Sequence, residues 1–203
     1  MKPRLLRPFA AAALACLLLA PGFAAAQEEI IEKSRTEAWI GIRAGRFASS
    51  DLVFQEVYGT GGTAIGLTAG VDFFRAGSFS LAAGLDLGRF ARTGASTVSA
   101  TAARMTIVPL TALIRAGLAA GTASFWLEAG GGPVFYTEDS EWIFSRGSAF
   151  GFRVGGGASL EILTGIVLQA YFRWSTAAKN MEDFSVNLGG TEIGGSLLFR
   201  FGI

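Results

Sequence analysis

Histidine is absent from this chain, whose 203 residues include only one cysteine and three lysines. The absence of histidine excludes mechanisms that need an imidazole base or an imidazole metal ligand. One cysteine cannot form an internal disulfide, and Cys16 lies in a segment that we expect to be removed. With 17 basic and 16 acidic residues, the chain has no charge surplus suited to nucleic acid. A charged fraction of 16% and a hydrophobic fraction of 51% exclude a disordered chain and favour one folded domain.

The first 26 residues have the pattern of a secretion signal. The basic residues are Lys2, Arg4 and Arg7, the apolar run covers residues 9–20, and residues 24–26 are alanine. We therefore expect a signal peptide at residues 1–26, cleaved after Ala26, and a short periplasmic lead at residues 27–36. An uncleaved membrane anchor is the alternative, but the run is shorter than the ~20 apolar residues needed to span a bilayer.

From residue 37 onward, apolar residues alternate with small or polar ones, and this period of two predicts β-strands. In one segment Leu81, Leu85 and Leu87 share one face, opposite Gly84 and Asp86. The pattern predicts eight strands, at residues 38–47, 62–73, 79–87, 104–115, 125–135, 150–162, 166–174 and 192–203. The segment 104–115 is apolar on both faces, so its orientation stays open.

The connections between these strands alternate in length. Short connections fall at residues 75–77, 118–122 and 163–165, and long polar ones at 48–61, 92–101, 137–147 and 175–186. Short periplasmic turns and long external loops are typical of outer-membrane barrels, as are aromatic residues near both ends of the strands. The sequence therefore predicts an all-β fold over residues 37–203, an eight-stranded antiparallel up-and-down transmembrane β-barrel with both termini in the periplasm.

A soluble lipocalin-like barrel is the competing architecture, because it has the same alternation with its apolar face turned inward. Its outer face would be rich in lysine and glutamate. Here the other face is mainly glycine, alanine, serine and threonine, and only Lys33 and Lys179 remain after the leader. Helical spans are not expected, because no segment after the leader offers ~18 apolar residues without a charge.

The C-terminal segment GGSLLFRFGI, residues 194–203, resembles the OmpA-like eight-stranded outer-membrane β-barrel superfamily. The stretches IVPL at 107–110 and LEAGGG at 127–132 are similar to strands of small surface-antigen and opacity-type barrels. The resemblance covers residues 38–203 and implies the fold and the location. It also implies that Phe199, Phe201 and Ile203 form the signal read by the barrel-assembly machinery, although the family usually ends in phenylalanine.

Charged residues on the small-residue face are expected to point into the barrel. They are Asp72, Asp86, Glu128, Glu161 and Glu192, with Arg43, Arg153, Arg173 and Arg200. The interior of an eight-stranded barrel is only wide enough for side chains, and unpaired charges there are costly. We therefore predict a salt-bridged plug that fixes strand register. A narrow path for ions or solutes is the alternative, and Glu128 with Asp86 could formally serve as an acid–base pair.

The third long connection, residues 137–146, is the candidate contact site for an extracellular protein. The residues proposed for this contact are Glu138, Asp139, Glu141, Trp142 and Phe144. Alternatively, the strands continue above the membrane and Trp142 and Phe144 pack on neighbours. Divalent-cation binding by the three acids is less favoured, because such loops need more oxygen ligands. The glycine-rich residues 59–63 are expected to be a flexible surface loop, since no helix is predicted there.

The sequence thus predicts a non-enzymatic integral outer-membrane barrel with a structural, adhesion or surface-antigen role, in a double-membraned bacterium. No cofactor, metal or nucleic acid is expected. The expected partners are outer-membrane lipid, periplasmic chaperones, the barrel-assembly machinery and an extracellular protein bound through the loops. A narrow channel for small solutes or hydrophobic compounds is the alternative function.

Overall fold

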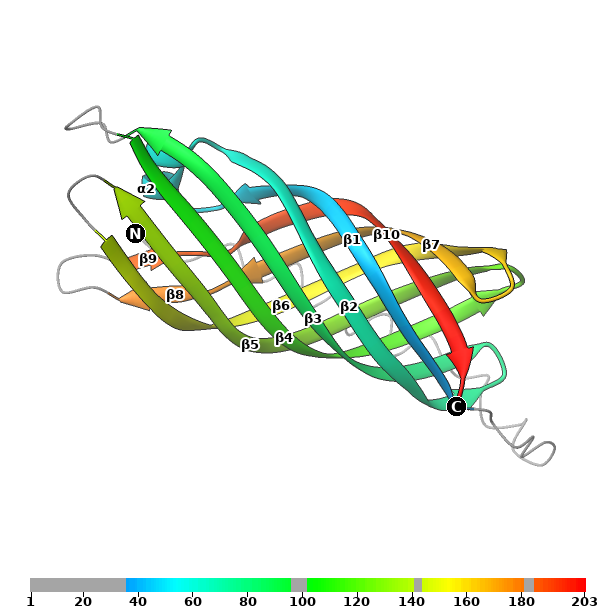
Figure 1. Ribbon diagram of the computed structural model, residues 1–203. Coiled ribbons are helices and arrows are strands. Elements are labelled where there is room, and N and C mark those ends of the chain that lie inside the picture. Colours follow the sequence, from blue (N-terminus) through cyan, green and yellow to red (C-terminus); the bar gives the residue numbers. More distant parts are fainter. Residues whose placement is uncertain (1–35, 96–101, 141–143, 181–184) are drawn as a thin grey trace, which may run out of the picture. The chain divides into compact units, whose positions relative to one another are not determined.

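The computed structural model describes residues 36–95, 102–140, 144–180 and 185–203. Eight strands form one closed antiparallel barrel in the ring order β1-β10-β7-β6-β5-β4-β3-β2 (Figure 1). The barrel strands are β1 (Glu37–Ser49), β2 (Gly61–Ala76), β3 (Phe79–Ala95), β4 (Ala102–Ala120), β5 (Ala123–Ser140), β6 (Phe144–Leu163), β7 (Ile166–Thr176) and β10 (Gly190–Gly202). This confirms the predicted eight-stranded up-and-down barrel. The signal peptide and most of the predicted lead lie outside the described residues.

At one end of the barrel the strands are joined by tight turns, and at the other end two of the connections contain secondary structure. Gly77, Gly121 and Gly165 have positive φ angles and close the turns after β2, β4 and β6, as only glycine does readily. At the loop end, the helix α2 (Leu52–Tyr58) joins β1 to β2, and the hairpin of β8 (Ala178–Asn180) and β9 (Ser185–Asn187) joins β7 to β10. Neither element was predicted, because residues 48–61 and 175–186 were expected to be long polar loops. The flexible loop expected at residues 59–63 was wrong in part, since residues 61–63 belong to β2, although no helix lies there, as expected.

Strands β3 to β6 extend further at the loop end than predicted. Strands β3 to β6 have 17 to 20 residues, although about 9–11 tilted residues cross a bilayer. Residues 137–140 and 144–147, predicted as loop, continue β5 and β6. The barrel wall therefore rises above the apolar belt on this side.

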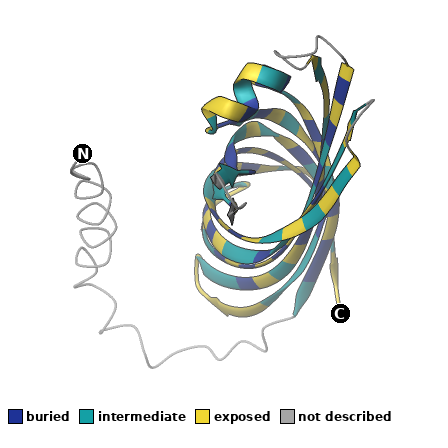
Figure 2. Cartoon of the chain, turned by 90° about the vertical axis from the view of Figure 1, so that its left-hand side faces the viewer, coloured by how far each residue is buried: buried dark blue, intermediate teal, exposed yellow. Residues whose placement is uncertain are grey.

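Inward and outward residues alternate along each strand, which appears as alternating buried and exposed bands in Figure 2. The orientation of β4, left open by the sequence, is resolved: Ile107 and Arg115 are buried, whereas Leu110 and Ile114 are exposed. Large apolar side chains are exposed on every barrel strand. A continuous apolar belt of this kind is the surface of a barrel embedded in lipid, which excludes the soluble alternative. No helix of the described residues is long and apolar enough to span a membrane.

Candidate functional site

The middle of the barrel is filled by a charge network centred on Asp86, which is fully buried. Its carboxylate accepts hydrogen bonds from Arg43 Nε and Nη2 at 3.0 and 2.9 Å. It also accepts from Arg153 Nη1 at 2.7 Å and from Arg173 Nη1 at 3.3 Å. Three guanidinium groups from three other strands therefore converge on one carboxylate.

Glu128 is the second acid of the network and shares two of these arginines. Arg115 Nη2 lies 2.9 Å from its Oε2, and Arg173 Nε lies 2.9 Å from its Oε1. Arg153 Nη2 is 3.5 Å from the same Oε1. Arg153 and Arg173 thus bridge Asp86 and Glu128, so neither carboxylate is available as the free acid or base that the enzymatic hypothesis needs.

Glu192 completes the network on the loop side. It accepts a hydrogen bond from Arg43 Nη1 and another from the Tyr171 hydroxyl at 2.7 Å. We call the seven charged residues the central network: Arg43, Asp86, Arg115, Glu128, Arg153, Arg173 and Glu192. Four cations face three anions among largely buried groups, and each of the three acids is paired with at least one arginine.

Arg115 is the member that the sequence did not reveal. Its guanidinium lies over the rings of Trp126 and Trp39, 4.1 and 4.8 Å from their centroids. Its register partner on β5 is Glu128 itself. The signal was therefore present as a cross-strand pair of opposite charge, but the double-sided apolar pattern of 104–115 hid which way Arg115 points.

Glycine on neighbouring strands makes room for these arginines. A Cβ built on Gly88 would lie 2.6 Å from Arg43 Nη2 and 3.0 Å from Pro109. A side chain at position 88 would thus displace a guanidinium bonded to Asp86. The small-residue face predicted from sequence is the space that the network occupies.

Asp72, Glu161 and Arg200 share the inner side but lie outside the central network, at the turn end. Asp72 pairs with Arg75 at 2.8 Å, Glu161 accepts from the backbone N–H of Gly165 at 3.1 Å, and Arg200 Nε is 3.6 Å from Glu37. All three line a polar cavity of about 300 Å³. The nine predicted lumen charges are therefore six network members and three residues of this cavity.

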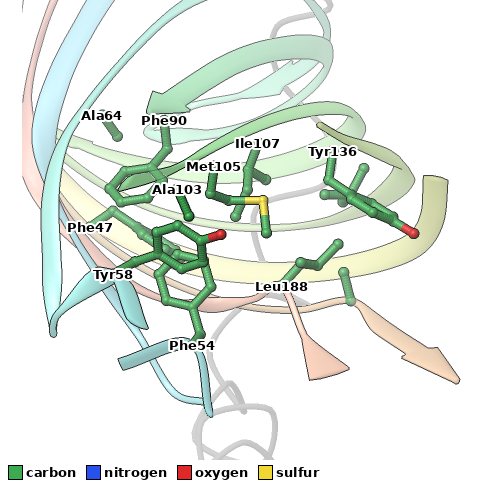
Figure 3. Close-up of a cluster of buried hydrophobic side chains, with 12 residues drawn as sticks. Phe47, Phe54, Tyr58, Ala64, Phe90, Ala103, Met105, Ile107, Tyr136 and Leu188 are labelled. Atoms are coloured by element: carbon green, nitrogen blue, oxygen red, sulfur yellow. The ribbon is translucent and has the colours of Figure 1, made fainter. Parts of the chain in front are cut away.

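The loop half of the interior is apolar rather than charged. Figure 3 shows its buried cluster: Phe47, Phe54, Tyr58, Ala64, Phe90, Ala103, Met105, Ile107, Val134, Tyr136, Ala177 and Leu188. Helix α2 contributes Phe54 and Tyr58, and the Phe54 ring lies 6.2 Å from the Phe90 ring. Between this cluster and the central network remains a cavity of only about 60 Å³.

Polar contacts hold α2 over the barrel mouth. The Tyr58 hydroxyl donates a hydrogen bond to Glu138, and Arg92 Nε donates to the Tyr58 carbonyl at 3.1 Å. Burial and the hydrogen bond to Glu138 raise the pKa of Tyr58 above its ordinary value. Glu138, predicted as a contact residue for a partner, thus binds a residue of this chain.

The first and last loops are tied together through Asp51 and Asn187. Asp51 caps α2 by accepting from the Phe54 N–H at 3.0 Å, and its other oxygen accepts from the Asn187 N–H at 2.8 Å. Asn187 Oδ1 accepts from the N–H groups of Ala177 and Gly189 at 2.9 and 3.0 Å. The loop end is therefore a connected cap.

Of the other predicted contact residues, two lie on the described surface and two do not. Asp139 and Phe144 are register partners on β5 and β6, and both are exposed. Glu141 and Trp142 lie outside the described residues.

At the C-terminal end of the chain, Phe199 and Phe201 are half-exposed on the outer face of β10, followed by the exposed Ile203. Their role as an assembly signal stays a prediction.

Neither a protein-family model nor a curated protein matches this sequence. Among solved structures, neisserial surface protein A (NspA) is similar over 82% of this chain and 96% of its own, at a TM-score of 0.54 and 14% identity. The outer-membrane protein OprG from Pseudomonas aeruginosa is similar over 83% of this chain and 97% of its own, at a TM-score of 0.53 and 10% identity. Outer-membrane protein W of E. coli is similar over 82% of this chain and 98% of its own, at a TM-score of 0.52 and 15% identity. The chain therefore has the fold of the small, OmpA-like outer-membrane barrels.

Proposed function

We propose that this protein is a non-conducting barrel of the bacterial outer membrane whose extracellular cap serves as a contact surface, in an adhesion or structural role. The observation that carries the proposal is the closure of the interior at two levels. The central network crosses the barrel at its middle, and the apolar cluster under α2 crosses it at the loop end.

The two layers close the lumen in different ways. A solute passing the network must break charge-assisted hydrogen bonds among fully or nearly fully buried groups. A hydrated ion passing the loop half must enter an apolar cluster with only about 60 Å³ free beside it. A narrow channel needs one continuous polar path through the barrel, and these two layers interrupt it. The structure therefore favours the surface role.

The cap offers a surface that could bind a partner. On α2, Leu52 and Val53 are 74% and 55% exposed, while Phe54 on the opposite side is buried. Because Asp51 and Asn187 fix the helix to the last loop, this apolar pair is displayed on a preformed support. A preformed surface loses less conformational entropy on binding than a free loop does. With Asp139 and Phe144 on the β5–β6 edge, it forms the proposed contact surface for an extracellular protein.

Conductance across planar bilayers tests the closure. The folded chain should insert without sustained current steps. Sustained openings in the parent protein that Arg153→Ala or Glu161→Ala alters would contradict the proposal and favour the narrow channel.

Adherence of bacteria that produce the protein to cultured epithelial cells tests the contact surface. Leu52→Ser with Val53→Ser should reduce adherence while the barrel keeps its heat-modifiable migration in gels. A matched control, Leu127→Ser, changes an apolar residue that is 70% exposed on the barrel wall and should leave adherence unchanged. Equal adherence of the parent and the α2 variant would contradict the contact role.

We also propose that the chain is exported through the inner membrane and reaches the outer membrane with the help of periplasmic chaperones and the barrel-assembly machinery. The apolar belt supports it, because such a surface would aggregate in an aqueous compartment without an escort. That the chain is not an enzyme also stays a prediction, resting on its lack of histidine.

A further inference from the structure

The outer wall of the barrel contains a hollow of about 750 Å³ on the face formed by β7, β10, β1, β2 and β3, which lie side by side (Figure 1), and Val108 of the next strand, β4, also lines it. The surface that the hollow exposes is mainly apolar, although Arg43, Arg89, Gln169 and Ser196 also contribute to its lining. The outward side chains around it include Ile42, Ile65, Leu67, Leu87, Leu168 and Leu197. These residues point away from the lumen, so the hollow belongs to the lipid-facing surface.

Strand register shows how the hollow is built. Gly195 lies between Ala170 on β7 and Ala44 on β1, in one row of small outward residues that we call the floor row. Gly195 and Ala44 line the hollow, and Ala170 continues the row beside it on β7. The row below is large, with Leu197 beside Leu168 and Ile42. The row above contains Phe172, Ile193 and Arg46. The floor row continues through Ile65 to Arg89 on β3.

Two outward arginines lie in or next to this hollow. Arg89 lines it, and Arg46 follows Ala44 on the same outward face of β1. Both side chains are exposed, and no carboxylate in the described part of the chain forms an ion pair with either. A lipid-facing arginine costs about 2–4 kcal/mol at the bilayer midplane and about 0–1 kcal/mol near the interface. They are therefore expected at the outer interface, where lipid phosphates lie.

The floor row rises obliquely towards these arginines. Ala170 is four residues from the turn-end start of β7, whereas Arg89 is ten residues from the start of β3. Four strand spacings of about 4.8 Å separate the two ends, so the row runs for about 19 Å. An acyl chain lying along the row would extend from the interface towards the bilayer interior.

We propose that this hollow is a binding site for a phosphorylated lipid of the outer leaflet. An acyl chain fills the row of Ala44, Gly195 and Ala170, and Arg89 and Arg46 hold the phosphate. Guanidinium groups suit this task because their planar donors match phosphate oxygens. The inference rests on the membrane location proposed above, but not on the contact role of the cap.

The outward arginines elsewhere on the barrel have different surroundings. On the opposite wall, the outward Arg104 has Asp139 as its register partner, so a carboxylate of the chain already faces it. Arg146 lies near the loop-end start of β6, on the same outward face as the exposed Phe150 and Phe152, and does not line the hollow. The β1–β3 face therefore combines an apolar hollow with Arg89 in its lining and Arg46 beside it, and neither arginine forms an ion pair within the described residues.

Native mass spectrometry of the full chain, folded in detergent micelles, tests the site with lipid A as the probe. Each of Arg46→Gln and Arg89→Gln should weaken lipid A binding about fivefold, since one basic side chain near an anionic lipid contributes about that factor. Ala44→Leu, which fills the floor without changing charge, should weaken it as well. The matched control Arg146→Gln should bind as the parent does.

Three outcomes would overturn the proposal. One is unchanged binding in the double variant of Arg46 and Arg89. Another is equal binding of lipid A and its dephosphorylated form, which would leave the arginines without a role. The third is a dimer of the parent that Ala44→Leu dissociates without an effect on lipid A, which would make a second copy the occupant. Insertion of the parent into vesicles, followed by heat-modifiable migration, checks the membrane location separately.

Discussion

Replacing Asp86 by asparagine tests the central network at its most connected point. The change keeps the size of the side chain and removes one negative charge. In the folded barrel, Arg43, Arg153 and Arg173 would then share an amide that can accept but cannot neutralise them. The network would hold four arginines against two carboxylates, in a region where Asp86 is fully buried.

The expected loss is about 3–5 kcal/mol of unfolding free energy, the cost of leaving a buried charge without its partner. Because Asp86 serves three arginines, we expect the upper part of that range. Glu37→Gln is the matched control, since it removes a carboxylate paired with Arg75 at the partly exposed turn end. There the loss should stay below about 1 kcal/mol, as for exposed ion pairs.

Urea unfolding in lipid vesicles, followed by tryptophan fluorescence and by heat-modifiable migration, measures both losses. Adding Arg153→Gln to Asp86→Asn should recover part of the stability, because the double variant removes a cation that has lost its anion. A loss below about 1 kcal/mol for Asp86→Asn alone would show instead that water already solvates these groups.

Three further predictions concern the cap and the lumen. Asp51→Ala should cost about 1 kcal/mol as a lost helix cap, seen as faster hydrogen exchange in α2, and unchanged exchange would contradict the capping role. Because the pKa of Tyr58 is raised, the cap should keep its stability below about pH 10, the ordinary tyrosine value, and lose it as the pH rises through the raised value. Tyr58→Phe should abolish that alkaline change in protease resistance, and its persistence would show that Glu138 does not act through Tyr58. Gly88→Val should lower the urea midpoint by displacing Arg43, and a parent-like midpoint would argue against the tight fit.

The sequence predicted the strands because each transmembrane residue faces either lipid or the lumen, and these two environments select different side chains. The rule failed for residues 104–115, since Met105 and Ile107 face the apolar cluster while Leu110 and Ile114 face lipid. Where both environments are apolar, alternation disappears. The direction of Arg115 was lost with it.

The level of a residue along the barrel was harder to predict than its side. Alternation correctly assigned Asp72, Glu161 and Arg200 to the inner face but carried no information on height, which depends on register and tilt. Helix α2 escaped prediction for a related reason. It is one short helix held by Asp51, Asn187 and the barrel mouth, so its stability comes from tertiary contacts that no local pattern records.

The lipid-facing orientation of the outward side chains is tested most directly by the environment of outward and inward positions in a lipid bilayer. Spin labels would be placed on single cysteines at Leu127 and Val154, which face outward, and at Thr111 and Ser159, which face inward, in a Cys16→Ser background. We expect oxygen dissolved in the lipid to relax the labels at Leu127 and Val154 strongly, while a water-soluble nickel chelate does not reach them. Strong relaxation of those two labels by the nickel chelate would contradict the lipid-facing orientation.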